Sequence, residues 1–590
     1  MVNLTIDTIK VNVKEGSTIL EAAKTVGINI PTLCAWTEIG HTPGACRVCL
    51  CEVEGQRNLV ASCVFPAAEG MIVKTTTERV RHARKLNVEL LLANHPTDCN
   101  ICIRNGSCEL QKVAEAVGLR SVRFEYPATK EKHLDQSSPS IVRDSSKCIK
   151  CYRCVTVCEQ IQTACVLQPS FRGDKVFIGP PFDMPLIETN CTMCGQCVLA
   201  CPVGALYEKD DTEAVWAALQ DPTKHVVVQE APAIRAALGE DLGMPVGSLV
   251  TGKMLTALRR LGFDKIFDTN FTADLTIMEE GSELLQRVNE GGKLPMITSC
   301  SPGWIKFCEH FYPDLLDNLS TCKSPQQMMG ALIKSYYAQQ AGIDPKDIVS
   351  VSVMPCTAKK YECQRDEMND SGYQDVDYVL TTRELSRMIK QAGIDFASLP
   401  DSDYDNPLGE YTGAATIFGA TGGVMEAALR TVYALVTGTN LASLDVTPVR
   451  GLEGVKEAAV EVGKLGKVKV AVAHGLGNAR KLMDKIRDGS ADYAFIEVMC
   501  CPGGCVSGGG QPIAPSNEKR ITRAAALYKD DGSVQKFRQS HENPSVKKIY
   551  EIFLEKPLGH KSHELLHTHY VKRGTDMPHK KQGVSEVRDK

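Results

Sequence analysis

The segments "CIKCYRCVTVC" (residues 148–158) and "CTMCGQCVLACP" (residues 191–202) decide the organisation of this chain. Each carries four cysteines in the same spacing, C-x2-C-x2-C-x3-C. Thiolates are soft ligands that suit iron, and a short loop can wrap several of them around one cluster. Two copies of this spacing predict a pair of [4Fe–4S] clusters.

The two runs have the signature of bacterial two-cluster ferredoxins, in which the fourth cysteine of each run binds the other cluster. One cluster is therefore predicted to be held by Cys148, Cys151, Cys154 and Cys201, and the other by Cys158, Cys191, Cys194 and Cys197. Only the second run has the usual following proline, and Glu159 replaces it in the first. We assign residues 138–210 to a ferredoxin domain with two [4Fe–4S] clusters.

The first 80 residues contain a different cysteine pattern, C-x11-C-x2-C-x13-C. It is similar to that of plant-type ferredoxins, which predicts a [2Fe–2S] cluster on Cys34, Cys46, Cys49 and Cys63. Zinc is the alternative, and the long gaps between the cysteines fit it poorly. Alternating residues up to Val13, a turn at Glu15–Gly16 and a capping box at Thr18–Glu21 predict a hairpin and a short helix in a β-grasp domain at 1–80.

Residues 81–125 hold one histidine and three cysteines, His95, Cys99, Cys102 and Cys108. One imidazole and three thiolates suit either zinc or a [4Fe–4S] cluster, so the spacing leaves both open. The iron–sulfur runs that follow favour iron. The first 210 residues therefore predict one [2Fe–2S] and three accessory [4Fe–4S] clusters, arranged as an electron wire.

Composition limits the remaining possibilities. The chain has 590 residues, which predicts about three or more domains. Its 25 cysteines indicate metal binding in a reducing compartment, and with no targeting signal in the first residues we expect a cytoplasmic protein. A net charge of −4 gives no basic surface for nucleic acid, and no apolar run is long enough to span a bilayer.

The C-terminal two-thirds alternates short β-branched runs with helical stretches. Strands are predicted at 225–229, 265–269, 294–299, 348–355, 376–382, 467–474 and 492–499. This alternation predicts a large, two-lobed α/β domain at 222–530, with its site beyond the carboxyl ends of the strands. Three of those ends lead into cysteines: Cys300, Cys356, and the group Cys500, Cys501 and Cys505. Thiolates from these loops could hold one more [4Fe–4S] cluster.

Three segments carry a resemblance to a known family: "TSCSPGW" (298–304), "MPCTAKKYE" (354–362) and "EVMCCPGGCVSGGG" (497–510). They resemble the signature loops of the [FeFe]-hydrogenases, and the match covers nearly the whole chain. It is similar to the long clostridial-type enzymes and to catalytic subunits of NADP-reducing multisubunit hydrogenases. The resemblance implies an H-cluster, in which one cysteine joins a [4Fe–4S] cubane to a diiron subsite with CO, cyanide and a dithiolate.

The resemblance also implies roles for individual residues. Cys356, Cys501 and Cys505 would bind the cubane, with Cys505 as the bridge to the diiron subsite. Lys359 would bond a cyanide ligand, and Met354 and Met499 would pack beside the diiron unit. A proton relay would run through Glu280, Glu283 and Ser320, with Arg287 near the protein surface. Without the resemblance, the two glutamates read as a solvated helix face.

One position departs from the family. Better-known relatives read Thr-Ser-Cys-Cys-Pro, in which the first cysteine passes protons and the second binds the cubane, but here Ser301 follows Cys300. A serine alkoxide is a harder ligand than a thiolate and suits iron–sulfur clusters less well. Either Cys300 is itself the ligand, or the additional thiol of Cys322 or Cys500 compensates, or the site is unusual. We take Cys300 as the working ligand. Cys165, Cys308 and Cys363 are expected in the core.

The predicted function is the reversible conversion of protons and electrons into H2. A non-catalytic iron–sulfur electron-transfer protein and a hydrogen sensor are the alternatives. No nucleotide-binding fingerprint is present, and "HGLGNAR" (474–480) reads as a strand–helix turn. The expected partners are therefore ferredoxin or flavin- and NAD(P)-binding subunits, together with maturation proteins.

Residues 531–590 resemble the small subunit of these enzymes, and the end "PHKKQGVSEVRDK" (578–590) is expected to be disordered.

Overall fold

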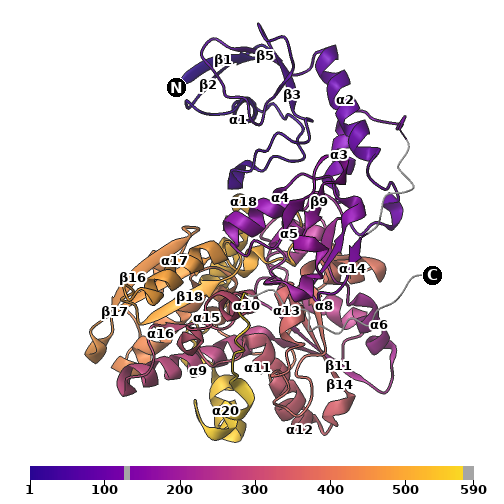
Figure 1. Cartoon of the computed structure of the whole chain (residues 1–590). Helices are drawn as coiled ribbons and strands as arrows, with labels where there is room; N and C mark the ends of the chain where they lie inside the picture. The colour runs from indigo at the N-terminus through magenta and orange to yellow at the C-terminus, as the bar shows by residue number, and fades with distance from the viewer. Residues whose placement is uncertain (125–132, 576–590) are drawn as a thin grey trace, which may run out of the picture.

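The computed structural model describes residues 1–124 and 133–575, so the tail predicted to be disordered lies outside the described residues. The chain descends from a small N-terminal domain through the cysteine-rich middle to a large C-terminal part (Figure 1). In Figure 1 the N-terminal domain is at the top, and α12 (Ala338–Ala341) and α20 (His560–Leu566) are at the opposite end. Among the described residues, none of the helices has the length and apolar character needed to cross a membrane.

The N-terminal domain is a mixed five-stranded sheet in the order β2-β1-β5-β3-β4. Its strands are β1 (Val2–Ile6), β2 (Ile9–Val13), β3 (Leu50–Val53), β4 (Val60–Ala61) and β5 (Ile72–Lys74). The predicted capping box is present at the start of α1 (Ile19–Thr25), where the Thr18 hydroxyl accepts from the Glu21 amide at 3.2 Å. The predicted position of the hairpin turn is wrong. The chain reverses after Ile6, where Asp7 takes a left-handed φ of 53°, so both strands of the hairpin are complete by Val13, before Glu15 and Gly16.

The middle of the chain is built from short elements around loops. Two helices come first, α2 (Glu78–Leu92) and α3 (Glu109–Ala116). The following ferredoxin-like part has the sheet order β10-β7-β6, with a separate β8–β9 hairpin. Its elements are β6 (Leu134–Asp135), β7 (Ile141–Asp144), α4 (Arg153–Thr156), β8 (Gln168–Ser170), β9 (Phe177–Gly179), α5 (Gln196–Ala200) and β10 (Leu206–Glu208). Short elements leave long stretches of backbone free to wrap the cysteines around clusters.

The C-terminal part contains two four-stranded sheets. The first is fully parallel in the order β12-β11-β14-β15, formed by β11 (His225–Glu230), β12 (Lys265–Asp268), β14 (Ile348–Met354) and β15 (Tyr378–Thr381). The second has the order β13-β18-β17-β16, formed by β13 (Met296–Ile297), β16 (Val455–Glu461), β17 (Lys467–His474) and β18 (Phe495–Met499). Strand β16 was not predicted, because it is an antiparallel edge strand whose residues are mostly exposed or half-buried.

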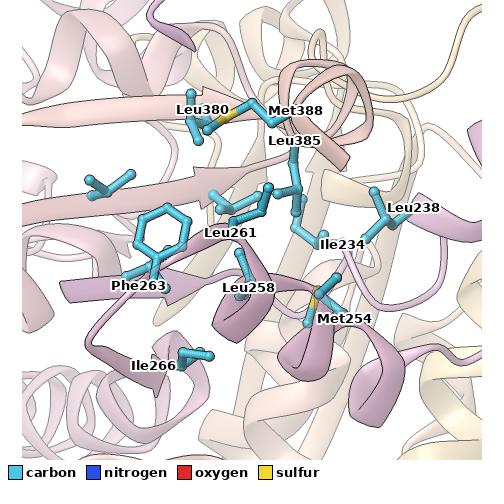
Figure 2. Packing of buried hydrophobic residues seen from close by; sticks show 14 of the residues in the cluster. Ile234, Leu238, Met254, Leu258, Leu261, Phe263, Ile266, Leu380, Leu385 and Met388 are labelled. Atoms are coloured by element: carbon cyan, nitrogen blue, oxygen red, sulfur yellow. The ribbon is translucent and has the colours of Figure 1, made fainter. Parts of the chain in front are cut away.

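Helices cover both sheets. They include α6 (Thr212–Gln220), α8 (Thr251–Leu261), α9 (Thr269–Glu290), α10 (Pro302–Phe311), α11 (Pro325–Leu332), α13 (Ala358–Glu362), α14 (Thr382–Gln391), α16 (Gly423–Thr437), α17 (Leu476–Arg487) and α18 (Asn517–Lys529). Figure 2 shows the core beside the first sheet, where Leu258 of α8 and Met388 of α14 belong to one buried cluster. Each such side chain contributes about 1.5–3 kcal/mol by leaving water. This packing fixes where the strands end, and therefore where the loops that follow them meet.

Candidate active site and cluster sites

The three cysteine-bearing loops of the C-terminal part meet in one pocket. Strand β13 leads into Cys300, β14 into Cys356, and β18 into Cys501 and Cys505. All four line the pocket, together with Met354, Met499 and Lys359. The carboxyl ends of parallel strands from two sheets thus bring together residues that are far apart in the sequence. Burial raises the pKa of the Cys505 thiol to about 12, so any metal bound there would have to displace the thiol proton.

Lys359 is oriented by a carboxylate that the sequence analysis did not single out. Its Nζ donates to Glu362 Oε2 at 2.8 Å and to the Cys300 carbonyl at 3.2 Å. Glu362 also accepts from the hydroxyl of Ser324 at 2.9 Å and from the amide of Gln326 at 3.1 Å. The lysine is therefore held in the pocket as a fixed cation. Its spacing of three residues from Glu362 on one short helix was the available signal.

The glycines of "CVSGGG" allow the loops to approach one another closely. A Cβ on Gly508 would lie 2.0 Å from the Pro355 carbonyl oxygen, and one on Gly509 would lie 2.5 Å from the Cys194 carbonyl oxygen. Neither contact leaves room for a side chain. The loop after β18 can therefore lie directly against both the loop after β14 and the second ferredoxin run.

The predicted relay residues lie together, on α9 and on the loop that carries Ser320. Ser320 Oγ donates to Glu283 Oε2 at 2.8 Å, and Arg287 Nη2 donates to Glu283 Oε1 at 2.6 Å. Both glutamates of α9 are buried, so the alternative of a solvated helix face is wrong. Burial, and after it the charge of Glu283, raises the pKa of Glu280 to about 8. Such a group can exchange protons near neutral pH.

Cys300 lines the thiol pocket and lies within the electrostatic influence of the predicted relay. Burial raises its pKa well above the usual value, and the charge of Glu280 raises it further, ahead of that of Cys505. Ser301 also lines the pocket, and its Oγ accepts a hydrogen bond from the Cys500 amide at 3.2 Å.

Two further cysteines lie beside these groups. Cys322 is buried, with its Sγ 3.9 Å from Glu283 Oε2. Cys500 lines the pocket next to Cys194 of the ferredoxin part. Cys308 and Cys363 are buried as predicted, but Cys165 is exposed and its predicted core position is wrong. Cys165 follows a short helical segment in a left-handed turn with a φ of 53°, which directs it to the surface.

The structure also gathers the predicted ligands of the accessory clusters. One pocket is lined by Cys148, Cys151, Cys154 and Cys201, and a second by Cys158, Cys191, Cys194 and Cys197. Each pocket therefore takes one cysteine from the opposite run. A third is lined by His95, Cys99, Cys102 and Cys108. In the N-terminal domain, Cys34 lies beside Cys46 and Cys63, and Cys49 lies beside Cys63. These donor sets fit iron–sulfur clusters.

Hydrogen bonds join the three N-terminal parts close to their predicted cluster ligands. His41 Nε2 lies 2.9 Å from the carbonyl of Cys151, and Arg153 Nη2 donates to the carbonyl of Ala35 at 3.1 Å. Arg104 Nη2 donates to the carbonyl of Cys201 at 3.2 Å. The three N-terminal parts are therefore connected next to their cysteines.

The second ferredoxin run contacts all three signature loops. Lys306, on the helix after "TSCSPGW", donates to the Cys191 carbonyl at 2.7 Å. Thr357 of the second loop donates to the Met193 carbonyl at 2.8 Å. Gln196 donates to the Ser507 carbonyl of the third loop at 3.0 Å. One cluster site is thereby placed against the catalytic pocket.

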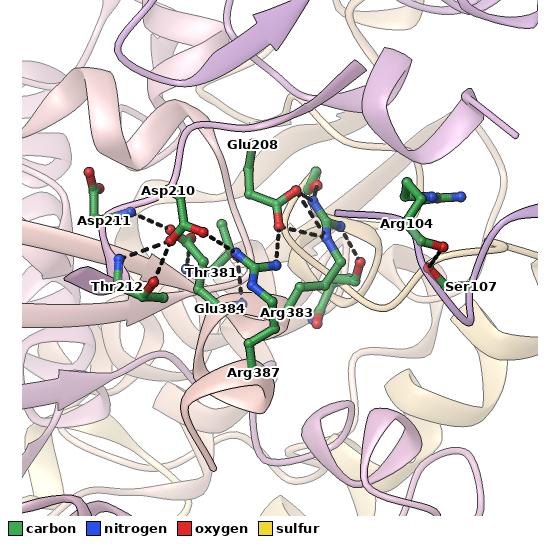
Figure 3. Close-up of polar contacts among 12 residues, drawn as sticks. Arg104, Ser107, Glu208, Asp210, Asp211, Thr212, Thr381, Arg383, Glu384 and Arg387 are labelled. Carbon is green, nitrogen blue, oxygen red and sulfur yellow. Dashed lines mark hydrogen bonds and ion pairs between the residues drawn. The ribbon is translucent and has the colours of Figure 1, made fainter. Parts of the chain in front are cut away.

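A buried ion-pair network holds the two parts together (Figure 3). Arg383 of α14 donates to Glu208 at 2.6 Å and to the Gly509 carbonyl at 2.9 Å. Arg387 donates to the other Glu208 oxygen at 2.9 Å. Although burial opposes ionisation, the two guanidiniums hold the pKa of Glu208 well below its usual value. Glu208 ends the last strand of the ferredoxin-like part, so this network fixes that part on the catalytic one.

Family comparisons agree with this division of the chain. Residues 224–509 match the iron only hydrogenase large subunit, C-terminal domain, and residues 517–573 match the iron hydrogenase small subunit. Residues 1–78 match a 2Fe-2S iron-sulfur cluster binding domain, and residues 84–123 match the NADH-ubiquinone oxidoreductase-G iron-sulfur binding region. Residues 138–207 match the ferredoxin-like domain of NADH-quinone oxidoreductase subunit 3.

Individual relatives extend along nearly the whole chain. The NADP-reducing hydrogenase subunit HndD of Solidesulfovibrio fructosivorans is 53% identical over 584 residues, covering 97% of this chain and 99% of HndD. Iron hydrogenase 1 of Clostridium pasteurianum is 43% identical, covering 97% of this chain and all of that protein (100%). A solved structure of apo [FeFe]-hydrogenase HydA1 from Chlamydomonas reinhardtii, in a cysteine-to-histidine variant, is 47% identical, with a TM-score of 0.56 over 62% of this chain and 100% of that one.

These relatives confirm the resemblance seen in the signature loops and the enzymatic function predicted from it, over the alternative of a non-catalytic protein. They also confirm iron–sulfur cofactors in the N-terminal parts. The chain belongs to the [FeFe]-hydrogenases.

Proposed function

We propose that this hydrogenase exchanges electrons with a partner through one [2Fe–2S] and three accessory [4Fe–4S] clusters. The observation that carries the proposal is the contact of the second ferredoxin run with all three signature loops, through Lys306, Thr357 and Gln196. An electron that reaches the cluster of Cys191, Cys194 and Cys197 is then next to the catalytic pocket.

The proposal assigns a role to each part of the chain. We propose a [2Fe–2S] domain at 1–80, a one-histidine, three-cysteine cluster domain at 81–125 and a two-cluster ferredoxin domain at 138–210. The catalytic domain would span 222–530, followed by a small-subunit-like segment at 531–590. The ligands are those gathered in the four accessory sites.

The H-cluster would supply the redox chemistry of H2 in the pocket. Cys356, Cys501 and Cys505 would hold it, with Cys505 as the bridging ligand. Lys359 offers a fixed cation to an anionic ligand, because Glu362 and the Cys300 carbonyl orient its Nζ. Met354 and Met499 give the pocket an apolar wall. These side chains bind and orient the group and exclude water from it.

Protons would move between the pocket and the surface along Cys300, Glu280, Ser320 and Glu283. Arg287 would mark the outer end, because it pairs with Glu283 and retains 14% side-chain exposure. The charge of Glu280 acts on Cys300, which supports a role as proton donor, whereas its place in the pocket beside Cys356, Cys501 and Cys505 supports the predicted cubane ligand. If Cys300 donates protons, the fourth cubane ligand comes from Ser301, Cys322 or Cys500. Of these, Ser301 and Cys500 line the pocket, whereas Cys322 lies beside Glu283.

The electron partner would be a flavin- and NAD(P)-binding subunit or a ferredoxin. HndD is named as a subunit of an NADP-reducing hydrogenase, and two N-terminal parts match domains of NADH dehydrogenases. Maturation proteins would also be required, because no side chain can synthesise CO or cyanide. The many free thiols suit a reducing compartment, which supports a cytoplasmic location.

Infrared spectroscopy of matured protein tests the proposal, since CO and cyanide ligands absorb where proteins do not. Wild-type protein should show these bands and evolve H2 from a reduced dye. In Cys300→Ala, retained bands with lost turnover would assign Cys300 as the proton donor. Loss of the bands together with turnover would assign it as a cubane ligand. Wild-type protein that evolves H2 without such bands would refute the proposed cofactor.

A further inference from the structure

We propose that Glu283, Cys322 and His567 form a binding site for a zinc-type divalent cation, and that the bound ion blocks the proton relay. The inhibitory part of this inference rests on the proposed role of Glu283 in proton transfer. The site itself rests on the positions of the three side chains. It lies beside Ser320, which donates to Glu283, and none of its three residues is among those that line the thiol pocket.

The three side chains come from distant parts of the chain. Glu283 lies on α9, Cys322 follows the loop that carries Ser320, and His567 directly follows α20. Cys322 and His567 are paired by an isolated antiparallel bridge. One ligand atom from each residue lies within 4.8 Å of the other two, and all three residues are buried. A thiol, an imidazole and a carboxylate are the donors that zinc prefers in proteins.

His567 is already oriented as a metal ligand would be. Its Nε2 lies 3.2 Å from Glu279 Oε2, and its Nδ1 lies 2.8 Å from the Thr321 hydroxyl. When Nε2–H donates to the carboxylate, Nδ1 carries a lone pair, which accepts from the Thr321 hydroxyl and would bind the metal once that hydroxyl rotates away. Metal-binding histidines typically donate their other ring nitrogen to a carboxylate in this way. Tyr550 Oη donates to the second Glu279 oxygen at 2.5 Å, which fixes the carboxylate in place.

The two carboxylate oxygens of Glu283 have different partners. Oε1 pairs with Arg287 at 2.6 Å, whereas Oε2 accepts from Ser320 and lies 3.9 Å from Cys322 Sγ. Zinc–ligand bonds of about 2.0–2.3 Å require ligand atoms about 3.3–3.8 Å apart. The three atoms would therefore move together by about 1 Å. Cys322 would bind as the thiolate and release its proton to solvent.

A cation at this point would interrupt the relay. Oε2 of Glu283 is the atom that accepts the Ser320 hydroxyl, so a metal bound there takes the place of the transferred proton. Arg287 would keep its partner oxygen and the helix would stay in place. Catalysis would slow although the clusters and their thiol ligands remain untouched.

Zinc K-edge X-ray absorption on the full chain tests the site without turnover. Protein with its full iron content, given one equivalent of Zn²⁺, should show one sulfur at about 2.3 Å and nitrogen or oxygen at about 2.0–2.2 Å. Zn²⁺ should lower dye-driven H2 evolution about 100-fold, the range of a lost proton-transfer group, with unchanged infrared bands. Cys322→Ala and His567→Gln should weaken the inhibition at least about tenfold, each measured against its own zinc-free rate.

Cys308→Ala is the matched control, because this cysteine is equally buried but outside the site, and it should keep full inhibition. A zinc spectrum without sulfur, or equal inhibition in Cys322→Ala, would overturn the site. Zinc bound by sulfur with unchanged turnover would overturn the blocking role. Glu283→Gln without zinc tests the relay separately: an unchanged rate there would refute the relay and leave the absorption result standing.

Discussion

The accessory cluster sites and the catalytic pocket hold similar donors in different ways. His95, Cys99, Cys102 and Cys108 fall within one short segment and line one pocket, which the ferredoxin-like part closes with Asp144 and Gly204. The thiols of the catalytic pocket, Cys300, Cys356 and Cys505, follow three strands in two sheets. The site of His95 is encoded in local spacing, whereas the pocket exists only when both sheets have folded and packed together.

This difference predicts how each kind of site responds to a substitution. A site whose ligands lie in one segment depends mainly on that segment, so a substitution there should affect that cluster alone. The catalytic pocket depends on packing over the whole C-terminal part and on the backbone contacts that Gly508 and Gly509 allow. Replacement of single residues can therefore separate the two regions.

The largest effect is expected from Cys356→Ala. Removing one cubane thiol should abolish the H-cluster infrared bands and all H2 turnover, because a four-ligand cluster cannot be held by the remaining donors. The accessory clusters should keep their electron paramagnetic resonance signals, since none of their ligands comes from this loop. Cys363→Ala, a buried cysteine outside the pocket, is the control and should keep the bands. Bands that persist in Cys356→Ala would remove it from the ligand set.

Glu280→Gln should slow turnover about 100-fold or more while all clusters remain, because a positioned proton-transfer group is worth about 10²–10⁴ in rate. The wild-type pKa of Glu280 is raised to about 8. H2 evolution needs the protonated form and should fall as pH rises through 8, whereas H2 oxidation needs the carboxylate and should rise. The variant should lose both dependences.

The control for this change is reduction of the accessory clusters by a dye, which should proceed normally in Glu280→Gln. Because the folded pKa lies above the unfolded value, Glu280 should also make the fold less stable as pH rises from about 4.5 to about 8. A variant with the wild-type pH profile would exclude Glu280 from the relay.

The sequence predicted the local sites more fully than the distributed one, for physical reasons. Ligand spacing within a loop is visible without the fold, and the pairing of each ferredoxin run with the other follows from it. Strand ends at Cys300, Cys356 and Cys501 were also visible, because buried parallel strands are apolar runs. Residues whose role depends on tertiary contact, such as Glu362 beside Lys359, gave little signal.

Burial of polar groups was hardest to predict. Glu280 and Glu283 have the helical spacing of an exposed face, and only the packing of α9 against its neighbours shows that they are enclosed. His567 lies about 280 residues further along the chain, and no local pattern connects it to Cys322 or Glu283. Strand β16 was missed because its alternating exposed residues resemble a polar loop.

Arg383→Ala should sharpen the comparison at the junction of the two regions. It leaves Glu208 buried beside fewer cations, which typically costs about 3–5 kcal/mol. The melting temperature should fall, and electron transfer from the accessory clusters to the H-cluster should slow, while each set of clusters stays intact. Lys346→Ala removes an exposed ion pair and should leave the melting temperature nearly unchanged. Equal melting temperatures for the two variants would show that this network does not hold the regions together.

The smallest effect is expected from Ser301→Cys, which introduces the thiol that the family resemblance implies at this position. Ser301 precedes α10 and its hydroxyl accepts the Cys500 amide, so a sulfur atom can replace the oxygen with little change in the backbone. If position 301 faces the cubane, the variant should keep its infrared bands and activity and hold the H-cluster more firmly on heating. If Cys300 is the ligand, the added thiol should change neither the bands nor cluster retention. The double variant Cys300→Ala and Ser301→Cys is compared with Cys300→Ala alone. Bands in both variants, with turnover in neither, would place the proton donor at 300. Bands lost in Cys300→Ala and recovered in the double variant would require Cys300 as the ligand, with the new thiol at 301 taking its place.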